Sequence, residues 1–155
     1  MPILLRQARA DDQEFLFQLY AGTRLHEIAA FGWPAAQQEM FLRMQFNAQH
    51  RSYESAYGNA DHQVIEQQGQ PIGRIMVLRG KDFTLLVDIA LLAEYRGRGI
   101  GGELLRGLIQ ECNRNSVPLR LQVLKTNPAL RLYERLGFIR TSEDQMYIQM
   151  ERQPE

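Results

Sequence analysis

A run of glycines and arginines, Arg96–Gly102, stands between an apolar segment and an amphipathic one. Glycine lets the main chain approach a ligand closely and adopt a positive φ. The free N–H groups at the start of the following helix would point outward at its positive dipole end, which suits an anion. The guanidinium groups of Arg96 and Arg98 would add charge-assisted hydrogen bonds to phosphate oxygens. The run therefore predicts a phosphate-binding loop.

Three alternative interpretations of this loop are a dinucleotide-binding fingerprint, a mononucleotide P-loop and a turn that binds nothing. Gly97, Gly99 and Gly102 match the spacing of a dinucleotide fingerprint. That fingerprint also requires an acid at the end of the next strand, and the segment Leu119–Leu124 contains none. A mononucleotide P-loop requires lysine and then serine or threonine after its glycines, whereas Gly102 is followed by Glu103. A glycine-rich turn without any ligand is the remaining alternative.

A single acid, Asp88, interrupts the strongly apolar segment Phe83–Leu92. An unpaired carboxylate inside a sheet is costly, so this residue requires a partner or a role. It either anchors an amine and accepts its proton, or it forms an ion pair with an arginine such as Arg74 or Arg120. The sequence leaves both alternatives open.

A second motif follows the next helix and strand, with the sequence Asn127-Pro-Ala-Leu-Arg-Leu-Tyr-Glu-Arg-Leu-Gly-Phe138. Together the two segments resemble the core motifs of the GNAT N-acetyltransferases. Arg96, Gly99 and Gly101 fit the pattern Arg/Gln-x-x-Gly-x-Gly/Ala, and the second segment fits Asn-x-x-Ala-x-x-x-Tyr-x-x-x-Gly-Phe. The motifs stand in the family's order, and the order of elements is similar over essentially the whole chain. Ala93, where many members have proline, is a departure that affects no ligand-contacting side chain.

The resemblance implies an enzyme that moves the acetyl group of acetyl-CoA directly to an amine of a small molecule or protein, in a ternary complex. The resemblance also implies that the strand before the loop splays from its parallel neighbour. Leu91 and its neighbours on that strand would offer main-chain groups to the pantetheine arm, as an added strand does. The implied pyrophosphate ligands are Arg96, Gly97, Arg98, Gly99, Gly101 and Gly102. Asn127 would bind the pantetheine arm, with helix capping as an alternative or additional role. Tyr133 would protonate the leaving thiolate, and packing in the core is its alternative.

The acceptor side is less defined. The resemblance implies a pocket lined by the first two helices and their loop, where Glu27 and Trp33 are the candidate acceptor-binding residues. A solvated helix face is the alternative for Glu27, and stapling of the second helix is the alternative for Trp33. The histidines lack the spacing of metal ligands, so no metal is expected.

The 155 residues include 18 basic and 18 acidic side chains, and this balance argues against a general nucleic-acid binder. Cys112 is the single cysteine, which excludes an internal disulfide. Because Met1–Ala10 lacks a long apolar core, we expect neither a signal peptide nor a membrane partner. A cytoplasmic protein is therefore expected, and a homodimer is compatible with it. A non-catalytic acyl-CoA sensor on the same fold is the main alternative function.

The elements that must position these groups follow from hydrophobic periodicity. Strands are predicted at Ile3–Gln7, His62–Glu66, Ile72–Leu78, Phe83–Leu92, Leu119–Leu124, Phe138–Thr141 and Gln145–Met150. Helices are predicted from Asp11 to about Leu25, from Pro34 to about Gln49, and at Gly99–Asn113 and Asn127–Leu136. The crossover between Phe83–Leu92 and Leu119–Leu124 implies one parallel strand pair. We expect a single α/β domain, 1–155, with a mixed, mostly antiparallel sheet and helices on both faces.

Three local features sharpen these expectations. Asp11 and Glu14 have the spacing of a capping box at the start of the first helix. The second helix is expected to carry its apolar side at Met40, Phe41, Met44 and Ala48. Three arginines of the later helices and strands, Arg106, Arg114 and Arg120, are expected to be solvated, with a contact to phosphate as the alternative.

Overall fold

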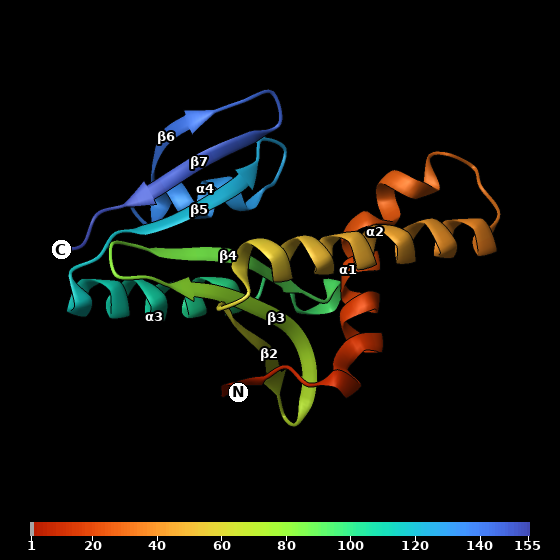
Figure 1. Ribbon diagram of the computed structural model, residues 1–155, viewed down its shortest axis with the longest axis horizontal. Coiled ribbons are helices and arrows are strands. Elements are labelled where there is room, and N and C mark those ends of the chain that lie inside the picture. The colour runs from red at the N-terminus through yellow and green to blue at the C-terminus, as the bar shows by residue number, and fades with distance from the viewer. Residues whose placement is uncertain (1) are drawn as a thin grey trace. The chain divides into compact units, whose positions relative to one another are not determined.

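The computed structural model describes residues 2–155, and it confirms the predicted mixed α/β architecture (Figure 1). The strands are β1 (Ile3–Gln7), β2 (Asp61–Gln67), β3 (Gln70–Arg79), β4 (Thr84–Leu91), β5 (Leu119–Leu124), β6 (Ile139–Glu143) and β7 (Tyr147–Arg152). The helices are α1 (Gln13–Ala29), α2 (Ala35–Tyr57), α3 (Ile100–Asn115) and α4 (Ala129–Arg135), with 3-10 turns at Ala10–Asp12 and Ala93–Tyr95. The strands form one sheet in the order β1-β2-β3-β4-β5-β7-β6.

Contacts divide the chain into two compact units. Unit 1 contains Met1–Arg74 and Ala90–Tyr95, and unit 2 contains Ile75–Ile89 and Arg96–Glu155. Strands β3 and β4 each begin in one unit and end in the other.

In unit 1, β1 pairs antiparallel with β2, from Ile3 opposite Gln67 to Gln7 opposite Gln63. The link from β2 to β3 is a tight turn in which Gln68 and Gly69 have φ angles of 53° and 76°. Two consecutive positive φ angles are the mark of the hairpin turn whose twist matches the flanking strands. The predicted hairpin is therefore confirmed.

The core between α1 and α2 is built from aromatic rings. Phe46 of α2 contacts Phe17 and Tyr20 of α1, with ring centroids 5.7 and 5.8 Å apart. Phe46 and Leu42, one helical turn earlier, are the buried residues of α2. Met40, Met44 and Ala48 are exposed, so the predicted apolar side was wrong except at Phe41, which packs against this core. Leu42 and Phe46 bury the face toward α1 because their spacing matches the Phe17 and Tyr20 ridge.

The start of α1 also differs from the prediction. Asp12, not Asp11, is the buried acid, and its two carboxylate oxygens each accept a hydrogen bond of 2.8 Å from Arg6. The Arg9 main-chain N–H adds a bond of 2.7 Å to the same carboxylate. Asp11 is exposed and pairs with the Arg9 side chain, so the capping box of Asp11 and Glu14 does not form. A non-local partner, Arg6, decides which acid is buried.

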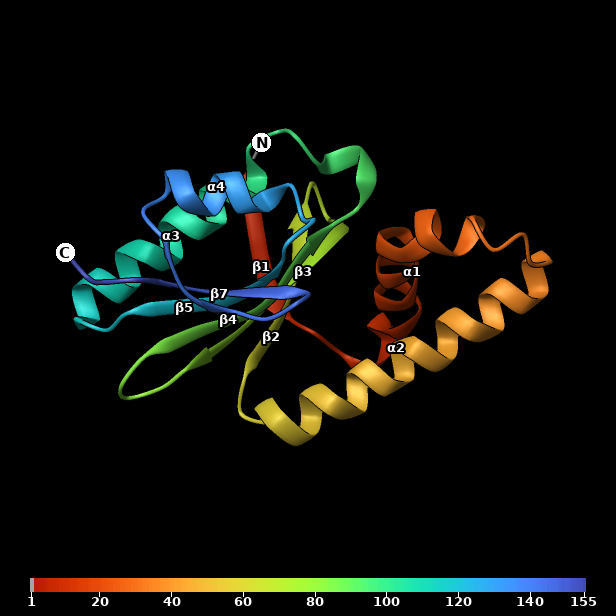
Figure 2. The same ribbon diagram turned by 90° about the horizontal axis from the view of Figure 1, so that it is seen from above.

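In unit 2, β5 pairs antiparallel with β7, from Leu119 opposite Arg152 to Leu124 opposite Tyr147. Helices α3 and α4 lie on the same side of β5 and β7 (Figure 2). The predicted apolar stripe of α3 is confirmed, since its buried residues include Ile100, Leu105, Leu108, Ile109 and Cys112.

Arg152 of β7 fixes the C-terminal end of α4. Its Nε–H donates a hydrogen bond of 2.8 Å to the Leu136 carbonyl, and one of its terminal nitrogens lies 3.3 Å from Asn113 Oδ1 at the end of α3. Gly137 then turns the chain away with a φ of 96°. This arrangement holds α4, and with it Tyr133, against the sheet.

Candidate functional site

The predicted phosphate loop is an open turn that requires glycine at two positions. Gly97 and Gly99 have φ angles of 74° and 82°, in the left-handed region that disfavours residues with a Cβ. A Cβ at either position would meet no atom within 4 Å. Glycine is therefore needed for its conformation, and the space around both residues is free to receive a ligand.

The loop ends directly at the positive end of α3. Gly99 caps the helix, and the first helical hydrogen bond runs over 3.0 Å from the Glu103 N–H to the Gly99 carbonyl. The N–H groups of Ile100, Gly101 and Gly102 consequently lie outside the helix's own hydrogen-bond ladder. Three adjacent amides at a helix N-terminus, preceded by Arg96 and Arg98, form an arrangement able to bind a phosphate.

The parallel pair β4–β5 is joined over only part of its length. The ladder links Thr84–Leu86 to Leu119–Leu121. Within the described residues of unit 2, Val87–Ile89 and Gln122–Leu124 continue as strands without extending that ladder. Figure 1 shows the two strands diverging beyond the paired stretch. The two strands therefore stop pairing after Leu86 and Leu121, which is the splayed pair that the resemblance implied.

Leu91 lies in unit 1, at the end of β4. The next residue, Leu92, donates its N–H to the Ile72 carbonyl over 2.8 Å. Gly73 allows this close approach, because a Cβ there would overlap the Ala90 carbonyl oxygen. The end of β4 is therefore held by main-chain contacts, and the role of Leu91 toward pantetheine stays a prediction.

Asn127 caps α4. Its Oδ1 accepts a hydrogen bond of 2.9 Å from the Ala129 N–H, and its carbonyl accepts one of 3.1 Å from the Leu130 N–H. These bonds satisfy N–H groups of the first turn, as the capping alternative expects, although Pro128 occupies the N-cap position itself and the helix starts at Ala129. Asn127 lies three residues after the end of β5 and is exposed, so its side-chain NH₂ group is accessible for a second contact.

Tyr133 is buried, with 6% of its surface exposed, and its ring packs edge-on against Phe138 at 5.9 Å. Burial, and to a smaller extent the negative charge of Asp88, together raise the pKa of its phenol to about 12. The phenol therefore keeps its proton at neutral pH. Packing and proton donation are compatible here, since the ring contacts the core while the hydroxyl remains a donor.

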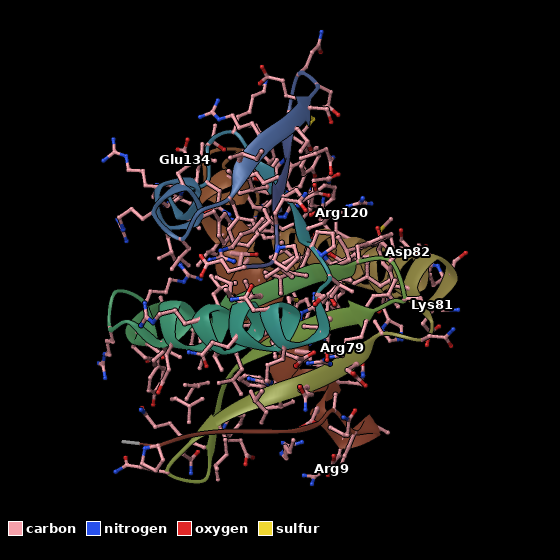
Figure 3. The ribbon with its side chains drawn as sticks, turned by 90° about the vertical axis from the view of Figure 1, so that its left-hand side faces the viewer. Arg9, Arg79, Lys81, Asp82, Arg120 and Glu134 are labelled. Carbon is pink, nitrogen blue, oxygen red and sulfur yellow. The ribbon has the colours of Figure 1, made fainter. Side chains whose placement is uncertain are left out.

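Asp88 is half-buried on the diverging part of β4. Of the two arginines named as ion-pair partners, Arg120 (labelled in Figure 3) pairs with Glu151 at 2.6 Å and lies over the Phe83 ring. Arg74, in unit 1, donates to Gln49 over 3.0 Å and lies over the Tyr53 ring. The electrostatic influence of Asp88 on Tyr133 places these two predicted catalytic groups in one neighbourhood of unit 2.

The two predicted acceptor residues lie in unit 1, in α1 and in the turn that follows it. Trp33 packs between Phe31 and Phe41, with ring centroids 5.1 and 5.2 Å away, so its stapling role is confirmed. Glu27 is exposed and forms a 3.3 Å pair with Arg24 on the same helix. The contact of either residue with an acceptor stays a prediction.

Arg106 is exposed, as expected, and it is also a neighbour of the loop. Its guanidinium lies beside Gly102, 3.3 Å from the position that a Cβ of that glycine would occupy. The signal was the spacing of four residues, which places both on one face of the helix.

Among residues 2–155, no group of three or more histidine, cysteine, aspartate or glutamate side chains is arranged to hold a metal ion. None of the helices in this range combines the length and apolar character needed to cross a membrane.

Solved structures with the same fold cover almost the whole chain. The PaiA N-acetyltransferase of Thermoplasma acidophilum, solved in complex with coenzyme A, has a TM-score of 0.71 and 19% identity, covering 99% of each chain. The ribosomal-protein-S18-alanine N-acetyltransferase of Escherichia coli has a TM-score of 0.66 and 21% identity, covering 98% of this chain and 94% of its own. At this identity the likeness concerns the fold.

Sequence identity to a curated relative is higher, over a shorter stretch of the chain. A Bacillus subtilis (strain 168) protein, provisionally named ribosomal protein bS18-alanine N-acetyltransferase, is 32% identical over 90 residues, or 57% of this chain. The match spans 58% of that relative's length. Residues 58–140, more than half of the 155, match the sequence profile of the acetyltransferase (GNAT) domain. The matched range contains both motifs, the diverging strands and Tyr133, and the chain belongs to the GNAT acetyltransferase family.

Proposed function

We propose that this protein is an acetyl-CoA-dependent N-acetyltransferase. The observation that carries the proposal is the divergence of β4 from β5 after Leu86 and Leu121, in a unit that also holds the open glycine loop. A gap between two strands accepts an extended, amide-containing chain through main-chain hydrogen bonds. Pantetheine is such a chain, and a pyrophosphate at its end fits the amides of α3.

In this proposal the binding residues divide by the part of the coenzyme that they contact. Arg96, Gly97, Arg98, Gly99, Gly101 and Gly102 hold the pyrophosphate. Leu91 and the diverging stretch of β4 bond the pantetheine amides. Asn127 donates its side-chain NH₂ to the same arm while its Oδ1 remains bonded to Ala129. The thioester would then lie between the strands, on the side from which the amine attacks.

Asp88 and Tyr133 perform the two proton transfers. Asp88, directly or through a water molecule, accepts a proton from the ammonium group of the acceptor, leaving a neutral nucleophile. The amine nitrogen forms a bond to the acetyl carbon as the carbon–sulfur bond breaks. Tyr133 donates its phenolic proton to the departing sulfur, which would otherwise leave as a thiolate. The amine nitrogen loses its second proton as the amide forms, and this proton returns through solvent to the Tyr133 oxygen, which restores the phenol. The phenol suits this role because its raised pKa keeps it protonated until the sulfur needs the proton.

The acceptor is an amine, and a protein α-amine is the first candidate. This choice is supported by the names of the Bacillus subtilis relative and the Escherichia coli structure, both ribosomal-protein alanine N-acetyltransferases. Glu27 and Trp33 are proposed to contact the acceptor. We further propose that the chain acts as one catalytic domain in the cytoplasm, where the buried thiol of Cys112 stays reduced.

Two measurements test the function. Thermal unfolding with acetyl-CoA, NAD or ATP should show stabilisation by acetyl-CoA alone, by about 2.7 kcal/mol at 100 times the Kd. Thiol release should then be measured with alanine-starting peptides, amino acids, aminoglycosides and simple amines. No shift with acetyl-CoA, or a larger one with NAD, contradicts the coenzyme assignment. If acetyl-CoA binds but no amine in the panel causes thiol release, the result favours the alternative function, a non-catalytic acyl-CoA sensor.

A further inference from the structure

Arg106 lies over the first turn of α3. Two of its guanidinium nitrogens lie 3.3 and 3.6 Å from the point where a Cβ of Gly102 would be. Long helical side chains lean toward the helix N-terminus, and the missing side chain at Gly102 lets this one lie flat against the backbone. The guanidinium is thus directed back toward the end of the helix that carries the three amides.

No interaction within the protein explains this placement. Glu103 is three residues earlier and within reach of an i,i+3 pair. In residues 2–155, however, neither Glu103 nor any other group forms a salt bridge or hydrogen bond with the exposed Arg106 side chain. A cation in the first turn is also opposed by the helix dipole, which favours cations at the other end. An anion bound at the same turn would reverse that balance.

We propose that Arg106 binds a phosphate of the coenzyme, extending the anion site by one turn along α3. The inference rests on the proposed function, because it assumes that the coenzyme occupies the loop. A guanidinium beside Gly102 can donate two parallel hydrogen bonds to one phosphate group. The coenzyme offers two sources of such a group, the pyrophosphate and the phosphate on the ribose.

The experiment is a calorimetric titration of wild type, Arg106→Ala and Arg106→Gln with coenzyme A and with 3′-dephospho-coenzyme A. Loss of charge-assisted bonds to phosphate is expected to weaken binding about tenfold or more. Arg114→Ala is the matched control, since Arg114 is an exposed arginine in the last turn of the same helix. Melting temperatures without ligand should be equal in all variants because both arginines are exposed.

The two ligands identify the phosphate. Weaker binding of both ligands supports a contact to the pyrophosphate, and weaker binding of coenzyme A alone supports a contact to the ribose phosphate. Unchanged affinity for both ligands, or an equal loss in Arg114→Ala, overturns the proposal. A wild-type protein that does not bind coenzyme A contradicts the proposed function instead, so the two failures are distinguishable.

Discussion

In the proposed reaction the coenzyme is bound mainly by main-chain groups, whereas the candidate contacts to the acceptor are side chains. In unit 2 the decisive features are main-chain ones: two positive φ angles, three amides outside the helix ladder and a ladder that ends at Leu86. In unit 1 the candidates are side chains, Glu27 and Trp33, that also have local partners. Main-chain recognition imposes glycines at fixed spacing, whereas side-chain recognition imposes no such pattern. The coenzyme can therefore be inferred from motifs and the acceptor cannot.

The largest expected effect is on turnover in unit 2. Tyr133→Phe should lower kcat by about 10²–10⁴-fold, because one positioned proton donor is lost. Coenzyme affinity should be retained, since the ring still packs against Phe138. Steady-state kinetics with the amine found in the panel, together with coenzyme titration, checks both statements.

The control for this variant is Tyr95→Phe, which removes a phenolic hydroxyl elsewhere in the chain. Turnover in Tyr133→Phe above about a third of wild type, with chemistry rate-limiting, would remove the acid role. In wild type, kcat should not fall through ionisation of Tyr133 until the pH approaches about 12. An alkaline loss near pH 10 that is absent from Tyr133→Phe would also contradict the assignment.

The next effect concerns binding by the loop. Arg96→Ala should weaken coenzyme A binding by about tenfold to a hundredfold, the range expected for charge-assisted hydrogen bonds. The KM for the acceptor should change little if the groups that bind the coenzyme do not also bind the acceptor. Calorimetry and kinetics measure the two quantities, with Arg114→Ala as the matched control; an equal loss in the control would mean that general positive charge, not the loop, attracts the coenzyme.

A third prediction tests whether the ion pair of Arg6 and Asp12 stabilises unit 1. Hydrogen bonds from Arg6 lower the pKa of Asp12 to about 2, against an ordinary value of 3.8. A depressed pKa adds stability that is complete above about pH 5 and disappears as the pH falls toward 2. Asp12→Asn should therefore reduce the free energy of unfolding by about 1–2 kcal/mol at pH 7, and by much less near pH 2.

Urea unfolding at both pH values measures this difference. Asp11→Asn is the control, because Asp11 is exposed and its pair with Arg9 is a surface pair. A penalty for Asp12→Asn that is equal at pH 7 and pH 2 would show that the ionised pair is not the cause.

The smallest effect is expected at Glu27. Glu27→Gln should raise the acceptor KM by about twofold to fivefold and leave stability within about 0.5 kcal/mol, because exposed pairs contribute little. The matched control is Glu39→Gln, an exposed acid on α2. An unchanged acceptor KM would leave Glu27 as a solvated helix residue and would move the search for acceptor contacts to other side chains.

The fold was predictable because each element carries its own pattern. The alternating strand Leu119–Leu124 has the predicted bounds, and the apolar stripe of α3 is buried as the period of 3.6 residues requires. Predictions that depended on a distant partner were wrong. The capping box of Asp11 and Glu14 does not form, and the acid bonded at this point is Asp12, which accepts a hydrogen bond of 2.8 Å from Arg6. The Met40 side is exposed because the rings of α1 face Leu42 and Phe46.

In the candidate site, too, features with a local sequence pattern were predictable and features that depend on the folded chain were not. The glycines of the loop and the block from Asn127 to Tyr133 carry local spacing, so both could be found in the sequence. For Arg106 the sequence shows only the four-residue spacing from Gly102, whereas the direction of its long side chain is set in the folded helix. The partners of Trp33 come from the preceding turn and from Phe41 of the next helix, and only the folded chain brings them together.

The short ladder between β4 and β5 also has a consequence for motion. Successive N–H groups of a strand point to opposite neighbours, so about half of those in Val87–Ile89 and Gln122–Leu124 face the gap. Without ligand, amides that face the gap should exchange hydrogen with solvent through small local openings, far faster than amides of the Thr84–Leu86 stretch. Bound coenzyme would slow this exchange without any change of fold. The protein would then complete its sheet only while it holds its substrate.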